Sequence, residues 1–389
     1  MLNDPREFFA KLNDPRGQNK NLYHPLENVI FIALTAFICG YNDWVSVEDF
    51  AKENRSWFEK VLNMPYGIPS HDTFGNVMKM IDKDHFALCF AHWMTESVKD
   101  HTHIAIDGKF LQGGFKDTDS IHLVTAFASE TKLVLAQTQV NSKDNEITTL
   151  PRLLDMINLK GSVVTGDAMY CQKDVCKQLV KAKADYILSL KRNHEHLYDD
   201  VKLWLDTQFD SGNLPINETV DKDHGRIEVR RYALSTKIDW LDNKSDWTGL
   251  SAVAMVESTR IIGEDSHTER RYYLTSLTDL PIVAQYIRSH WAIENSQHWV
   301  LDVTFGEDRS VKLEKNARSN KALLTRTALN LLRDRDDTKL SVKRRRIRAS
   351  QNLDYREQVL FGRVLSPVAV KPPTSGGGYK ATHTVVRSR

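Results

Sequence analysis

The stretch His101-Thr-His-Ile-Ala-Ile-Asp-Gly-Lys109 is the part of the chain from which the fold can be worked out. Residues Ile104–Ile106 form a short apolar run, and the run stops at Asp107-Gly108. This pattern predicts a buried strand whose final carboxylate lies at the edge of a sheet, where a ligand can reach it. The alternative is a strand followed by an ordinary Asp-Gly turn.

A second acid follows a second apolar run. Ser162–Thr165 is predicted to be a strand, and it stops at Gly166-Asp167. Two carboxylates at strand ends of one sheet converge if the two strands are neighbours. Converging carboxylates are costly to ionise unless a cation lies between them. Because hard oxygen ligands favour Mg²⁺ or Mn²⁺ over zinc, the two aspartates predict a site for such a cation.

Length and composition limit the possible classes of protein. The 389 residues, of which 41% are hydrophobic, suffice for a large core and two or three domains. No apolar run approaches the ~20 residues of a membrane span, and the first residues lack the apolar core of a signal peptide. The four cysteines are few for this length, which is typical of a reducing compartment. We therefore expect a cytoplasmic protein with no membrane partner.

The net charge of +2 conceals an uneven distribution. Residues 1–100 hold 10 basic and 14 acidic residues, whereas residues 307–389 hold 20 basic and 8 acidic residues. A basic end on an otherwise mildly acidic protein favours a polyanionic partner. The alternative is a solvated basic tail.

The periodicity of apolar residues divides the chain into regions. Residues 1–100 are predicted to form an all-helical N-terminal domain. Residues 101–306 follow the order β-β-β-α-β-α-β, which predicts an α/β core with a mixed sheet and a β-rich insertion at about 192–275. Residues 307–365 are predicted to be a basic helical region, and the Pro- and Gly-rich residues 366–389 a disordered tail.

A third acid lies on the last core helix, which is predicted to begin near Pro281. Ile287, Trp291, Glu294, His298 and Leu301 are spaced by four, three, four and three residues, so they share one helical face. A glutamate on a buried face needs a partner. An ion pair or a position at the rim would explain it, but two aspartates at the sheet edge favour a third metal ligand.

Several motifs together resemble the DDE insertion-sequence transposases called H-repeat-associated proteins. The resemblance runs from about residue 22 to about residue 332. It is carried by Ile104-Ala-Ile-Asp-Gly-Lys109, Asn145-Glu-Ile147, Val164-Thr-Gly-Asp-Ala168, His224-Gly-Arg-Ile-Glu228, His290-Trp-Ala-Ile-Glu-Asn295 and His298-Trp-Val-Leu-Asp-Val-Thr-Phe-Gly-Glu-Asp308.

This resemblance implies an RNase H-like catalytic core in which Asp107, Asp167 and Glu294 bind two Mg²⁺ or Mn²⁺ ions. It implies a DNA transposase that cleaves transposon ends and joins them to target DNA, acting as a homodimer on double-stranded DNA in the bacterial cytoplasm and nucleoid. Relatives carry a Tyr-Arg-Glu-Lys signature around the glutamate; here His290 replaces the Arg and Leu301 replaces the Lys. The alternatives are a metal-dependent nuclease without strand transfer and an inactive DNA-binding remnant.

Cationic and polar residues near these motifs are candidate DNA contacts, since Lys and Arg neutralise phosphates. The alternatives are solvated lysines, a turn with a cross-strand ion pair in the insertion, and a solvated helix face at the basic end. The candidates are Lys109, Lys191, His224, Arg226, His290, Asn295, Lys343, Arg344, Arg345 and Arg346.

Overall fold

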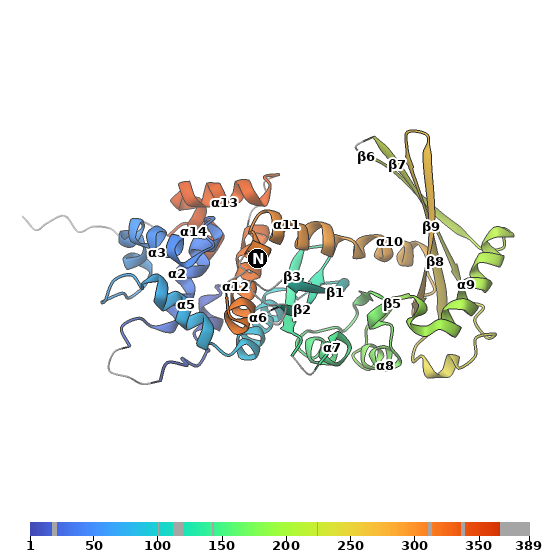
Figure 1. Cartoon of the computed structure of the whole chain (residues 1–389), viewed down its shortest axis with the longest axis horizontal. Helices are drawn as coiled ribbons and strands as arrows, with labels where there is room; N and C mark the ends of the chain where they lie inside the picture. The colour runs from blue at the N-terminus through green and yellow to red at the C-terminus, as the bar shows by residue number, and fades with distance from the viewer. Residues whose placement is uncertain are drawn as a thin grey trace, which may run out of the picture.

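The computed structural model describes residues 1–17, 22–99, 101–111, 120–141, 144–223, 225–309, 313–335 and 339–365. The molecule is elongated, with helices at one end, a sheet in the middle and long hairpins at the other end (Figure 1). In the described part of the chain, no helix is both long and apolar enough to cross a membrane. The predicted tail, 366–389, lies outside the described residues.

The N-terminal region is helical, as predicted. Local signals explain where its helices begin: Ser70 accepts a hydrogen bond from the backbone N–H of Thr73, and Asp82 accepts one from His85, which are N-cap contacts. The helices are α1 (Arg6–Phe9), α2 (Leu26–Ile38), α3 (Trp44–Glu53), α4 (Arg55–Val61), α5 (His71–Met80) and α6 (Lys83–Ser97).

The C-terminal helices α12 (Lys315–Asp334), α13 (Val342–Gln351) and α14 (Leu353–Phe361) pack against these N-terminal helices (Figure 1). The side chain of Asn320 in α12 donates hydrogen bonds to the carbonyls of Met78 and Ile81, and that of Asn330 donates to Val134 in the sheet. One apolar core therefore runs from the first helices through α12 to the sheet. The domain boundaries at residues 100 and 307 stay predictions.

The described strands form one mixed sheet in the order β3-β2-β1-β4-β5-β9-β8-β7-β6. β1 is parallel to β4, and β4 to β5, while the other neighbours are antiparallel. The helices α7 (Glu146–Leu154) and α8 (Lys173–Lys181) are the crossovers between the parallel strands. The first five strands are β1 (His103–Leu111), β2 (Ile121–Ala128), β3 (Leu133–Gln139), β4 (Val163–Gly166) and β5 (Asp185–Leu190).

The structure corrects the predicted end of the first strand. β1 does not stop at Asp107-Gly108 but continues to Leu111, paired with β2 throughout. A turn at Asp107-Gly108 is therefore excluded. The glycine is explained by packing, because a Cβ on Gly108 would lie 2.5 Å from a carboxylate oxygen of Glu146.

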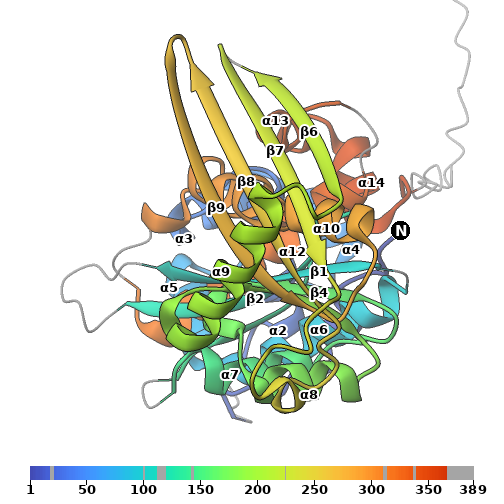
Figure 2. The same ribbon diagram turned by 90° about the vertical axis from the view of Figure 1, so that its right-hand side faces the viewer.

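The insertion is one helix followed by two long hairpins. α9 (Glu195–Asp210) precedes β6 (Ile216–Asp223), β7 (Arg226–Ser235), β8 (Ala252–Ile262) and β9 (Asp265–Thr275). β9 returns to pair with β5, so the hairpins extend the central sheet and then project beyond it (Figures 1 and 2). The sequence did not predict β6, since Ile-Asn-Glu-Thr-Val-Asp-Lys-Asp is polar and lies at the exposed edge of the sheet.

The last core helix is divided into three segments. α10 (Leu280–His290) is followed by a π-helical turn, η5 (Ile293–His298), and then by α11 (Trp299–Val303). A π-turn forms hydrogen bonds between residues i and i+5 and is frequent at functional sites. It changes the angular position of every side chain beyond it.

Candidate active site

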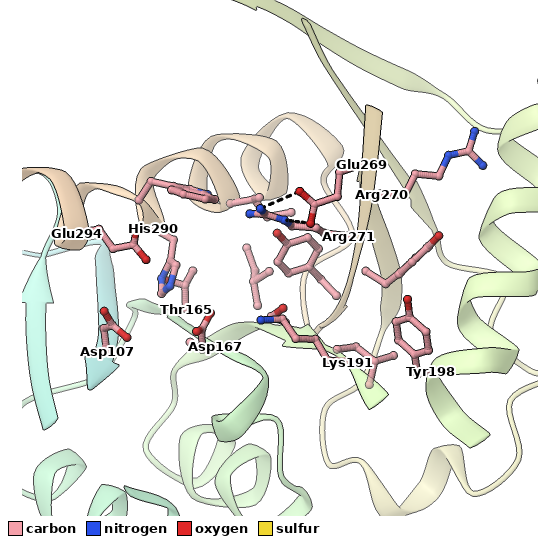
Figure 3. Close-up of a pocket in the computed structure, with 18 residues that line it drawn as sticks. Asp107, Thr165, Asp167, Lys191, Tyr198, Glu269, Arg270, Arg271, His290 and Glu294 are labelled. Atoms are coloured by element: carbon pink, nitrogen blue, oxygen red, sulfur yellow. Dashed lines mark hydrogen bonds and ion pairs between the residues drawn. The ribbon is translucent and has the colours of Figure 1, made fainter. Parts of the chain in front are cut away.

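The first two predicted acids are brought together by the register of two parallel strands. Ile106 of β1 pairs with Gly166 of β4, and Asp107 and Asp167 are the next residues along each chain. The carboxylates therefore lie side by side at the carboxyl edge of the sheet. Figure 3 shows them facing one space together with Glu294.

Glu294 reaches this space from the π-helical turn. The structure differs from the predicted single stripe, because Ile287 and Leu301 are buried whereas Trp291 and Glu294 are exposed. Glu294 is the second residue of the π-turn and does not lie on the buried face of the helix. It nevertheless lines the same cavity as Asp107 and Asp167.

This cavity has a volume of about 420 Å³. It lies between the middle of β1, the ends of β4 and β5, the second half of β9 and the helix α10 with η5 (Figure 3). The rest of its lining includes Lys191, His290, Arg271 and a fourth acid, Glu269, which forms an ion pair with Arg271 at 2.9 Å. The cavity thus combines a carboxylate edge with a wall that carries both basic and acidic groups.

Burial and the neighbouring acids raise the pKa of Asp107 to about 7, from an ordinary value of 3.8. Burial of the carboxyl group is the largest cause, followed by the negative charge of Asp167, with Glu294 adding a smaller effect. An added cation would remove this repulsion, so the donor set fits a hard divalent metal. Among the described residues, however, no three Asp, Glu, His or Cys side chains already stand in metal-ligand geometry.

His290 lines the cavity beside the acids. Its Nδ1 lies 2.8 Å from Oγ1 of Thr165, and Nε2 of His103 lies 2.8 Å from the same oxygen. Burial lowers the pKa of His290 and lowers that of His103 to about 3. His290 is therefore fixed to β4 by its contact with Thr165, and its burial disfavours the charged form.

Lys109 is not available for DNA, which corrects its assignment as a phosphate contact. Its side chain is only 7% exposed and forms ion pairs with Asp302 and, at 3.6 Å, with Glu307. Glu307 also pairs with the fully buried Arg326 of α12. These residues tie β1 to α11 and α12, so Lys109 has a structural role and Asp302 is its partner.

The remaining candidates near the cavity stay predictions. Lys191 is exposed and lines the cavity, pointing into it in Figure 3. Arg226 and Asn295 line a second hollow of about 410 Å³, next to the first, and Arg226 also pairs with Glu228 at 3.1 Å. His224 lies outside the described residues.

The basic run at the C-terminal end is divided between two faces of α13. Lys343 and Arg344 are exposed. Arg345 donates to the carbonyls of Leu340 and Leu332. Arg346 is 5% exposed and donates to the carbonyl of Phe37. The prediction of a DNA contact is therefore wrong for the buried Arg346, and Arg345 is largely committed to main-chain carbonyls.

Two further residues, one against Asp107 and one against the neighbouring Gly108, were not predicted. His298 has its Nδ1 3.5 Å from Oδ2 of Asp107, and burial together with Lys109 and Arg326 lowers its pKa to about 4. Glu146 lies behind the strand, against Gly108. His298 was predicted to be on the same helical face as Glu294, and Glu146 was part of the motif Asn145-Glu-Ile147, but neither pattern indicated a contact with Asp107 or Gly108.

Fold and site define an RNase H-like protein with a carboxylate triad at the edge of its sheet. Comparison with known proteins agrees: residues 98–331 match the model of the transposase DDE domain, and residues 6–94 match the model described as DDE_Tnp_1-associated. The chain belongs to the DDE transposase family.

Individual relatives support the same family. The chain is 37% identical to a putative transposase YncI of Escherichia coli O157:H7, over 91% of this chain and 93% of that protein. It is 32% identical to the H repeat-associated putative transposase YhhI of Escherichia coli K12, over 90% of this chain and 96% of that protein. It is also 40% identical, over 72% of this chain and 97% of the relative, to an uncharacterized protein in the dhlA 3′ region of Xanthobacter autotrophicus.

Proposed function

We propose that this chain is the transposase of an insertion sequence, which cleaves the ends of its element and joins them to target DNA. The observation that carries the proposal is the placement of Asp107 and Asp167 at adjacent strand ends, with Glu294 facing the same cavity. Asp107 is partly buried beside the exposed Asp167 and Glu294, and gathering three acids around one cavity is costly if they serve only stability. This cost is explained if the acids hold cations for catalysis.

Asp107, Asp167 and Glu294 would hold two divalent cations, Mg²⁺ or Mn²⁺. Such ions, when bound, supply Lewis-acid activation of an attacking oxygen and stabilisation of the leaving 3′-oxygen of a phosphodiester. The protein's own contribution is to orient these carboxylates. Asp107 is fixed by β1, with Gly108 N–H donating to its Oδ1 at 2.9 Å, while Glu294 is carried by the π-turn.

DNA would approach across the side of the molecule that carries both α13 and the tips of the hairpins (Figure 1). Lys191 lies at the cavity itself. Arg271 stacks over the ring of Trp291 at 4.9 Å from its centroid and is paired with Glu269, so a phosphate would have to compete with this carboxylate. The exposed Lys343 and Arg344 lie farther along the molecule. These positions support contacts with phosphates on both sides of the acids.

The partners in this proposal are the terminal inverted repeats of the element and the target DNA, both double-stranded. The protein would work as a homodimer in the cytoplasm, at the nucleoid when bound to DNA, since two element ends must be held together.

The test uses a duplex that carries the DNA flanking the gene for this chain, incubated with purified protein, Mg²⁺ and a supercoiled target plasmid. The proposal predicts metal-dependent nicking at one position, followed by joining of the new 3′-end to the plasmid. Nicking without joining would favour a nuclease. Binding without nicking, with Mn²⁺ as well as Mg²⁺, would favour an inactive remnant.

A further inference from the structure

Glu146 is a buried acid to which the proposed reaction assigns no task. It is the first residue of α7, and its side chain is only 7% exposed. Its Oε1 lies 2.5 Å from Nε2 of His122 in β2, and its Oε2 accepts the hydroxyl hydrogen of Tyr170. Both oxygens are therefore fixed by side chains from different elements.

The carboxylate of Glu146 also packs closely against β1, the strand that carries Asp107. Successive residues of a strand point to opposite faces, so Gly108 presents its side-chain position to the face opposite Asp107. A Cβ built on Gly108 would lie 2.5 to 2.6 Å from the carboxylate atoms of Glu146. Glu146 thus supports β1 from behind, one residue from the acid.

The second contact of Glu146 reaches the turn that follows Asp167. Tyr170 ends the short helical turn η2 (Ala168–Tyr170), and its backbone N–H donates to the carbonyl of Asp167 at 2.9 Å. The Tyr170 ring is fully buried, so this turn has little freedom to move independently of its hydroxyl contact. One carboxylate therefore contacts the segments that bear both aspartates.

We propose that Glu146 is a positioning residue that sets the separation of the Asp107 and Asp167 carboxylates for metal binding. The inference rests on the proposed function, since it concerns the same two ligands. Glu146 is not itself a ligand, because it lies on the opposite face of β1 and both its oxygens are already bonded. A carboxylate is required because it accepts hydrogen bonds at both oxygens, whereas a glutamine accepts only at one.

A purely structural role is the competing explanation. An acid in the first turn of a helix stabilises that helix, and a buried hydrogen-bonded acid stabilises its surroundings. Such a role would lower the stability of the protein without changing metal affinity in molecules that remain folded. Metal affinity is therefore the measurement that separates the two explanations.

The experiment titrates purified full-length protein with Mn²⁺ followed by electron paramagnetic resonance, and measures the Mg²⁺ concentration for half-maximal DNA nicking. Glu146→Gln should raise both the Mn²⁺ dissociation constant and the half-saturating Mg²⁺ by ~10–100-fold, as loss of a ligand-orienting partner does. Tyr170→Phe, which removes one of the two bonds, should have a smaller effect of the same sign. Asp144→Asn removes an exposed charge beside Glu146 in sequence and should bind Mn²⁺ as the wild type does.

Gly108→Ala is an independent way to disturb the position of Glu146 behind β1. The added methyl group would push the Glu146 carboxylate away, so this variant should also bind Mn²⁺ weakly. In a Glu146→Ala background the clash is gone, and Gly108→Ala should then add little. If the losses of Mn²⁺ affinity in the two single variants add up in the double variant, Gly108→Ala does not act through Glu146, which contradicts the proposed positioning role.

The outcomes distinguish this inference from the proposed function. If folded Glu146→Gln binds Mn²⁺ with the affinity of the wild type, the inference is overturned and the proposed function is left intact. If Glu146→Gln does not fold, wild-type affinity in Tyr170→Phe and Gly108→Ala overturns it instead. Absence of Mn²⁺ binding and of nicking in the wild-type protein overturns the proposed function, and the inference with it.

Discussion

Asp107 and Asp167 are the residues that directly follow Ile106 and Gly166, a pair in register across the parallel strands β1 and β4. Their side chains consequently start from neighbouring backbone positions, although they lie far apart in the sequence. Asp107 lies within β1, which continues past it, whereas Asp167 lies between the end of β4 and the short turn η2. This relationship has consequences for activity and for stability that can be measured.

The first prediction concerns catalysis. Asp107→Asn keeps the shape of the side chain but removes a charged ligand, so Mg²⁺-dependent nicking should fall to background while DNA binding persists. Nicking is measured on a labelled duplex, and binding by a shift in electrophoretic mobility. Equal nicking by variant and wild type would remove Asp107 from the catalytic site.

The second prediction concerns pH in the metal-free protein. Because the folded state raises the pKa of Asp107 from 3.8 to about 7, this group keeps a proton in the folded state that the unfolded state releases. The free energy of unfolding should therefore fall as pH rises from about 4 to about 7. Each pH unit in this window costs at most about 1.4 kcal/mol. Urea unfolding in EDTA should show a weaker fall for Asp107→Asn than for the wild type.

The third prediction concerns added metal. A cation that binds only the folded protein stabilises it by mass action, by about 2.7 kcal/mol when its concentration is one hundred times its dissociation constant. Mg²⁺ at pH 8 should therefore raise the melting temperature of the wild type in thermal unfolding. The same concentration of Mg²⁺ should leave the melting temperature of Asp107→Asn nearly unchanged. An equal rise in the melting temperature of both proteins would point to a metal site elsewhere.

The fourth prediction separates two acids of the last core helix. Glu294→Gln should abolish nicking and leave stability almost unchanged, because Glu294 is exposed to the cavity. Asp302→Asn should lower the free energy of unfolding by about 1–3 kcal/mol, because it weakens the pairing of the buried Lys109. Measuring nicking and urea unfolding for both variants tests this. Abolished nicking in a stable Asp302→Asn, with activity in Glu294→Gln, would reverse the assignment.

The fifth prediction concerns the two faces of α13. Replacing the exposed Lys343, Arg344 and Arg348 by alanine should weaken DNA binding and reduce its dependence on salt by about one counterion for each phosphate that the protein no longer neutralises. Arg346→Ala, the control, should instead lower the free energy of unfolding by at least about 2 kcal/mol, because its guanidinium bonds buried carbonyls. An unchanged salt dependence in the triple variant would place the DNA surface on the hairpins.

Deleting the chain after Asp337 would not test whether the basic C-terminal region binds DNA. The removed segment contains Tyr355, Val359 and Leu360 of α14, which are at most 4% exposed, as well as the buried Arg346. Such a deletion would open the apolar core that the helices at both ends of the chain share. A loss of DNA binding after this deletion would then reflect unfolding of the protein and not the removal of a DNA contact.

The sequence by itself determined much of the local structure. Helices in the first hundred residues follow from apolar periodicity and from caps such as Ser70, and the core strands follow from short apolar runs such as Ile104–Ile106. The three acids could be chosen from the ends of such runs and from the resemblance in their motifs. These signals are local, since they depend on neighbouring residues in the chain.

Tertiary structure alone decided which polar residues are free. In the sequence, Lys109 and Arg346 cannot be told from exposed basic residues. In the folded chain both are buried, Lys109 paired with Asp302 and Arg346 bonded to the carbonyl of Phe37, each partner far away in the sequence. Glu294 lines the cavity from a π-turn that no periodicity indicated. Glu146 contacts Gly108 only because α7 packs behind β1. Strand register, helix packing and the pairing of buried charges depend on contacts between distant segments, so the folded chain, and not its local pattern, determines how the site is assembled.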